Sequence, residues 1–187
     1  ASLAYAPQTM LELLTEAGWS RSGDTLYRGR QSLALTLVVN QDNTYKTAVA
    51  DYLAASLRQS GIQITVEKLS WEAYTAALAG GDFDLYLGET RLTADFDLSA
   101  LIASGGALNY GGYANTETAS LLSAFRAASG DARVTAARAL AQNLAQQMPF
   151  TPLCFKCWSV LCQWGQVSGV QPTQSNVFSQ FWTWTVS

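Results

Sequence analysis

The segment GDFDLYLGETRLTADFD, residues 81–97, places an apolar strand directly before a loop that is rich in charge. Phe83, Leu85 and Leu87 share one parity, which is the period-two pattern of a strand with one well-buried face. Polar side chains then follow together: Glu89, Thr90, Arg91, Thr93 and Asp95. Ligands bind beyond the carboxyl ends of strands in open α/β sheets, so we predict a recognition loop here.

Two strand–helix units precede this segment. Alternating apolar residues predict strands at 33–39 and 62–66, and helical spacing predicts helices at 44–60 and 70–80. Short connections favour right-handed crossovers, so all three strands should end at one edge of a parallel sheet. The residues expected at that edge are 40–43, 69–71 and 89–95.

The flanking segments complete an α/β prediction. Thr9 and Glu12 have the spacing of a capping box for a helix at 9–17. Two helices follow Asn115 and are separated by Gly130, with Asp131 as the expected N-cap of the second and Pro149 as its end. Further strands are predicted at 151–164 and 178–186. The predicted fold is thus a mainly parallel sheet flanked by helices, with additional C-terminal strands.

Composition excludes some functions. The 187 residues are 49% hydrophobic and 13% charged, against roughly 25% charged in ordinary domains. Such a surface either faces a partner or is rich in small residues. The net charge of -3 supplies no basic field for phosphates, so we expect no nucleic-acid partner. No apolar run approaches the roughly 20 residues of a membrane span.

No metal or other cofactor is expected. The chain has no histidine, and its three cysteines lie in the apolar run CFKCWSVLC, residues 154–162. In an extended strand, Cys154 and Cys157 would be about 10 Å apart, which exceeds disulfide reach. Buried free thiols are the simplest expectation for these cysteines.

Several segments together resemble a known family, the extracytoplasmic solute-binding proteins of peptide and nickel ABC transporters (solute-binding family 5). The resemblance is to their C-terminal lobe, which has the type II periplasmic-binding-protein fold. The matching segments, in the family's order, are LLTEAGW (13–19), AVADYLAASLRQSGIQITVEKLSWEAY (48–74), GDFDLYL (81–87), TADFD (93–97), NYGGYANTETASLL (109–122) and MPFTPL (148–153).

The resemblance implies a binding function without catalysis. Residues 1–187 would be a single domain, excised from a protein whose N-terminal lobe is absent here. The implied partners are a small peptide or similar solute, the N-terminal lobe and the permease subunits of an ABC transporter. The implied location is extracytoplasmic, in the periplasm or on a cell-surface lipoprotein.

Asp95 is the sharpest candidate residue of the binding loop. Peptide-binding members of the family hold the peptide's amino terminus with an aspartate in this setting, and a charge-assisted hydrogen bond to an ammonium is strong. Asp95 or Asp97 could instead cap the following helix. Leu92 and Thr93 occupy positions where several peptide binders carry tryptophan.

The other candidates each have a structural alternative. Arg91 could clamp a solute carboxylate or pair with Glu89. Asn109, Tyr110 and Tyr113 resemble the family's loop near the cleft and could equally serve as turn and packing residues. Trp71 lies at the predicted sheet edge and could form a platform for the solute or pack against neighbours.

Two further functions are compatible with the sequence. A hydrolase would have to use carboxylates, with Glu89 and Asp95 as the only conceivable pair. An interaction domain would use exposed aromatic side chains and would not depend on Asp95 or Arg91.

Overall fold

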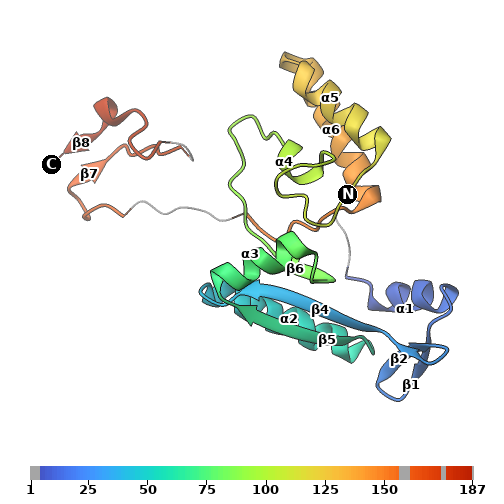
Figure 1. The fold of residues 1–187 in the computed structure, drawn as a ribbon. Helices are drawn as coiled ribbons and strands as arrows, with labels where there is room; N and C mark the ends of the chain where they lie inside the picture. The colour runs from blue at the N-terminus through green and yellow to red at the C-terminus, as the bar shows by residue number, and fades with distance from the viewer. Residues whose placement is uncertain (1–4, 156–160, 174–175, 187) are drawn as a thin grey trace.

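A three-stranded parallel sheet organises the first half of the chain (Figure 1). The computed structural model describes residues 5–155, 161–173 and 176–186. The strands are β4 (Ala34–Asn40), β5 (Gln63–Leu69) and β6 (Leu85–Leu87), in the spatial order β5-β4-β6. Both pairings are parallel. The predicted alternation of three strands with two helices is therefore confirmed, and the three strands end at one edge.

Two helices cover opposite faces of this sheet. Helix α2 (Thr44–Gln59) packs on the face of Leu37 and Val39, and α3 (Trp71–Gly80) packs on the face of Val38. The alternation along β4 explains this, because successive side chains point to opposite faces. Val38 and Val39 are both fully buried. The central strand β4 thus supplies core residues to both layers.

The edge strand β6 is less buried than its alternation predicts. Leu85 is 40% exposed, and only Leu87 of the predicted face joins the core under α2. Phe83 precedes the strand and packs instead with Tyr86 on the α3 side. The reason is that β6 pairs on one side only, and is three residues long.

A small antiparallel sheet and a helix precede the parallel sheet. Helix α1 (Pro7–Glu16) is followed by β1 (Ser20–Ser22), β2 (Thr25–Arg28) and β3 (Gln31–Ser32). The predicted capping box at Thr9 is wrong, because the helix begins at Pro7 and its N-cap, Ala6, makes no side-chain hydrogen bond. The fixed φ of proline suits the first turn of a helix, so Pro7 starts the helix instead.

A second helical cluster follows the predicted binding loop. It contains α4 (Ser99–Ile102), α5 (Thr116–Ala127) and α6 (Gly130–Gln147), and its core residues are Ile102, Leu122, Phe125 and Leu140. Asn115 caps α5 as predicted, accepting a hydrogen bond from the Thr118 N–H at 2.9 Å. The predicted N-cap of α6 is wrong: Ser129 holds that position, and Asp131 lies in the first turn.

The C-terminal strands are much shorter than predicted. The described part of residues 151–164 contains no strand, and residues 178–186 form the 3-10 helix η1 (Phe181–Thr183) and the strand β8 (Thr185–Val186). β8 pairs with β7 (Val167–Ser168) over two residues. Alternation alone overpredicted these strands, because a strand also needs a neighbouring edge with which to pair. Cys154 and Cys162 are exposed, contrary to the prediction of burial, and Cys157 lies outside the described residues.

Candidate functional site

The carboxyl edge of the parallel sheet brings the ends of its strands together, as predicted. The N–H of Gln41, just after β4, donates to the carbonyl of Leu69 at 2.8 Å. Beyond β6, Glu89 forms an ion pair with Lys46 in the first turn of α2, with an N–O distance of 3.1 Å. The two ends of the predicted loop thus differ in their contacts: its first acid binds the sheet layer, whereas its later acids bind the helical cluster.

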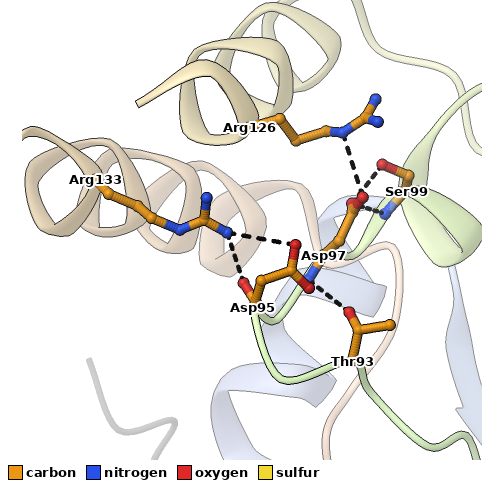
Figure 2. A network of polar contacts seen from close by, with 6 residues as sticks. All are labelled: Thr93, Asp95, Asp97, Ser99, Arg126 and Arg133. Carbon is orange, nitrogen blue, oxygen red and sulfur yellow. Dashed lines mark hydrogen bonds and ion pairs between the residues drawn. The ribbon is translucent and has the colours of Figure 1, made fainter. Parts of the chain in front are cut away.

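A tight turn forms the far end of the loop. The N–H of Phe96 donates to the carbonyl of Thr93 at 2.9 Å, which closes a turn over residues 93–96. Phe96 adopts a left-handed conformation with φ of 55°, which is unusual for a bulky side chain and costs about 1–3 kcal/mol. Phe96 as a whole is 53% exposed. The turn directs the side chains of Asp95 and Asp97 toward α5 and α6 (Figure 2).

Asp97 lies one residue before Leu98, the N-cap of α4, and its carboxylate binds Ser99 and Arg126. Its Oδ1 accepts hydrogen bonds from the N–H of Ser99 at 2.9 Å and from the Ser99 hydroxyl at 2.5 Å. Its Oδ2 lies 3.2 Å from Nε of Arg126, in the last turn of α5. Asp97 nevertheless does not cap α4, because the N-cap is Leu98 and no side-chain hydrogen bond caps the helix. The predicted capping role of Asp97 is therefore wrong, and its contacts instead fix the residues just before the helix.

Asp95 contacts α6 through Arg133. The Arg133 guanidinium donates to the backbone carbonyl of Asp95 at 2.7 Å and lies 3.7 Å from its carboxylate (Figure 2). The side chain of Asp95 nevertheless remains 59% exposed. Asp95 therefore does not cap α4, and its carboxylate is open to a further partner from solvent.

Hydrogen bonds favour the ionised form of both acids, which an ordinary aspartate already adopts at neutral pH. The hydroxyl of Thr93, followed by backbone N–H groups and the Arg133 charge, lowers the pKa of Asp95 below its ordinary value. The Ser99 hydroxyl and N–H, and more weakly Arg126 and Arg133, lower the pKa of Asp97. Both side chains are thus anions at neutral pH, which is the state that a cationic ligand requires.

An apolar groove adjoins this turn. It has a volume of about 520 Å³ and lies between the turn and α6. Phe96 and Leu98 line one side, and Val134, Ala137 and Ala141 of α6 line the other, with Asp95 and Arg133 among the lining residues. A mostly apolar hollow with a few polar groups is the usual form of a small-ligand site.

The predicted loop of residues 109–113 is held mainly by its own hydrogen bonds. The Asn109 amide donates to the carbonyls of Ala103 at 3.0 Å and Tyr113 at 2.7 Å, and its oxygen accepts from the Tyr113 N–H at 2.8 Å. The Tyr113 hydroxyl lies 2.6 Å from the hydroxyl of Thr118. These bonds occupy the polar groups that a ligand would need.

The remaining predicted residues are Tyr110, Trp71 and Arg91, which lie on three different segments of the chain. The ring of Tyr110 meets that of Tyr86 edge-on, with 5.9 Å between centroids. Trp71, the first residue of α3, is 63% exposed, and its ring lies 6.0 Å from that of Tyr74. Arg91 is exposed, and its side chain makes no ion pair with Glu89 or with any other residue that the structure describes. Arg91 and Trp71 thus keep surfaces that a ligand could contact.

Sequence reasoning missed both cations beside the turn: Arg133, which contacts Asp95, and Arg126, which pairs with Asp97 away from the candidate ligand residue. A signal existed for Arg133, because a cation in the first turn of a helix opposes the helix dipole and needs a compensating anion. Arg126 gave no such signal, since the last turn of a helix favours cations.

The described residues offer little else as a site. They contain no group of three or more side chains suited to holding a metal ion. A second hollow of about 550 Å³ lies between α2 and β5, and none of the predicted residues lines it. Among the described helices, none is long and apolar enough to cross a membrane.

Comparison with known sequences identifies the class of protein. The profile of the bacterial extracellular solute-binding proteins, family 5 Middle, matches residues 1–112. The chain therefore belongs to this family, and the resemblance found in its motifs is confirmed. A search of curated proteins found no match.

Solved structures share the fold. The periplasmic oligopeptide-binding protein of Thermotoga maritima, with mannohexaose bound, is 21% identical, with a TM-score of 0.77 over 95% of this chain and 35% of that one. The oligopeptide-binding protein AppA of Bacillus subtilis, in complex with a nonapeptide, is 18% identical, with a TM-score of 0.71 over 96% of this chain and 37% of that one.

A third structure differs in its ligand. NikA of Brucella suis, in complex with Fe(III)-EDTA, is 21% identical, with a TM-score of 0.66 over 77% of this chain and 31% of that one. The chain thus spans about a third of the length of the solved proteins that it matches.

Proposed function

We propose that this chain is one lobe of a two-lobed extracytoplasmic receptor, and that it supplies one wall of a cleft for peptides or similar solutes. Family membership and the similarity to peptide-binding proteins support the solute class. The observation that carries the proposal is Asp95, an ionised and largely exposed carboxylate on a turn beyond the carboxyl edge of the sheet. The second lobe would complete the cleft by hinge closure.

Asp95 would bind the free amine of the solute. Its carboxylate lies 3.7 Å from Arg133, longer than a hydrogen bond, so an ammonium could approach without breaking a short ion pair. Arg91 would meet a solute carboxylate, since its planar guanidinium can bind one with two hydrogen bonds. Glu89, Thr93, Asn109, Tyr110, Tyr113 and Trp71 stay predicted contacts, although Asn109 and Tyr113 serve the loop itself.

The same proposal covers partners and location. The receptor would act outside the cytoplasm and deliver its solute to the permease subunits of an ABC transporter, without catalysis. A carboxylate hydrolase gains no support from the geometry, because Glu89 and Asp95 pair with cations on different helices, Lys46 and Arg133.

A thermal-shift screen of the complete two-lobed protein tests the proposed function. Free-amine peptides, metal chelates and oligosaccharides are compared, because ligand binding to the native state raises the unfolding midpoint. We expect peptides to raise the midpoint most, and Asp95→Asn to reduce that rise. A rise with chelates or oligosaccharides alone would assign the receptor to another solute.

A further inference from the structure

The contacts of Arg133 connect the candidate ligand residue to the buried core of the helical cluster. Its guanidinium carbon lies 4.2 Å from the centre of the Phe125 ring, within the range of a cation–π interaction. Phe125 is 6% exposed and packs with Leu122 and Leu140. A buried aromatic ring therefore fixes the position of the guanidinium, whose side chain is 29% exposed.

The same guanidinium holds the backbone of the turn more tightly than the carboxylate of Asp95. It donates to the Asp95 carbonyl at 2.7 Å, whereas its distance to the carboxylate is 3.7 Å. A hydrogen bond to the carbonyl restrains the turn, and the longer contact leaves the carboxylate accessible. This division of contacts differs from that of Arg126, which pairs with a carboxylate oxygen of Asp97 at 3.2 Å.

We infer that Arg133 is a positioning residue for solute binding: it holds the turn of residues 93–96 on α6 so that the Asp95 carboxylate faces the solute's amine. This inference rests on the proposed function. Arg133 does not itself contact the solute. Arg133 acts through Asp95. When Arg133 is removed, the Asp95 carboxylate remains but can adopt orientations that do not suit the amine. Part of the binding free energy must then order the carboxylate, so the affinity falls.

A double-mutant cycle in the complete two-lobed protein tests this role. The ligand is the free-amine peptide that gives the largest shift in the thermal screen, and affinities are measured by titration calorimetry. Arg133→Gln is expected to weaken binding about fivefold in the wild-type background. In the Asp95→Asn background the same change should have almost no effect, because residues that act through one another are not additive. Arg133→Lys retains the charge but loses the planar fork, and should recover part of the loss.

Arg126→Gln is the matched control. It removes the neighbouring guanidinium on α5, which pairs with Asp97 rather than Asp95, and should leave affinity unchanged. If Arg133→Gln does not fold, Arg133→Lys replaces it in the same cycle. A loss of affinity that occurs only when Asp95 is present, and not in the Asp95→Asn variant, supports the role. Three results would overturn the role: wild-type affinity in the Arg133 variant, tighter binding by that variant, or an equal loss of affinity in the Asp95→Asn background.

Failure of the proposed function would give a different result. The wild-type protein would then bind no peptide, or the Asp95→Asn variant would bind the peptide as tightly as the wild type.

Discussion

At the scale of single residues, two neighbouring aspartates with the same charge have different surroundings. Asp97 accepts hydrogen bonds from Ser99 and pairs with Arg126. Asp95 has a largely exposed carboxylate 3.7 Å from Arg133, and its backbone carbonyl accepts a hydrogen bond from the same arginine. Sequence alone left both residues with capping and ligand alternatives, because either could precede the helix. The turn at Phe96 gives the two aspartates different partners, and no short sequence motif predicts this turn.

Asparagine and alanine substitutions separate the two contributions of Asp97. Asparagine keeps an oxygen that can accept the Ser99 N–H, and alanine does not. Because Asp97→Ala removes the hydrogen bond from Ser99, it should lower the free energy of unfolding by about 1 kcal/mol, and Asp97→Asn by clearly less. Chemical denaturation of both variants measures the difference. Equal losses would show that the ion pair with Arg126, rather than the hydrogen bond from Ser99, is the main contribution.

Tyr74 gives a pH dependence of opposite sign to that of the acids. Its hydroxyl donates to the Leu87 carbonyl at 2.9 Å, and burial, followed by repulsion from Tyr86 and Tyr110, raises its pKa to about 12. Because the unfolded tyrosine ionises near pH 10, the stability that this group contributes is complete below pH 10 and is lost as the pH rises to about 12. In the Tyr74→Phe variant, the free energy of unfolding should therefore fall less with rising alkaline pH than it does in the wild type. Denaturation midpoints between pH 9 and about 12 measure it, and identical declines in both proteins would contradict the assignment.

At the scale of elements, the sequence predicted the sheet layer well because each signal there is local. Asn43 and Ser70 cap α2 and α3, because their side chains accept hydrogen bonds from the backbone N–H groups of Lys46 and Ala73. The alternation along β4 matches its two buried faces. The C-terminal strands failed because their pairing depends on distant partners. Arg133 was missed for a similar reason, since its partner lies 38 residues away in the sequence.

The pairing of α5 with α6 depends on a buried polar cluster. The Thr118 hydroxyl lies 2.5 Å from Oδ1 of Asn143 and 2.6 Å from the Tyr113 hydroxyl, and Thr118 is fully buried. Thr118→Val keeps the shape but leaves these partners unsatisfied, so it should lower the free energy of unfolding by about 1–3 kcal/mol. Adding Asn143→Leu should cost less in this background than in the wild type, as measured by denaturation. Additive losses would mean that the two side chains do not depend on each other.

At the scale of the whole molecule, the described surface carries exposed apolar side chains near the C-terminus. The C-terminal segment exposes large apolar side chains, with Phe178, Phe181 and Trp182 each at least 60% exposed. Contiguous exposed apolar surface marks an interaction site more often than a solvated face. The thin charged surface noted in the sequence is consistent with this interpretation.

The isolated chain should therefore bind peptides weakly or not at all, because one wall of a cleft buries little of a ligand. Titration calorimetry of the 187-residue chain and of the complete two-lobed protein, with the same peptide, measures the difference. Tight binding by the chain alone would contradict the proposal that the cleft lies between two lobes.

The most direct test of the central claim is a comparison of one peptide with its N-acetylated form. Both are titrated calorimetrically into the complete protein and into its Asp95→Asn variant. If Asp95 holds the solute's amine, the wild type should prefer the free amine by roughly tenfold or more, and the variant should lose most of that preference. An equal preference in both proteins would contradict the claim and would limit Asp95 to shaping the turn.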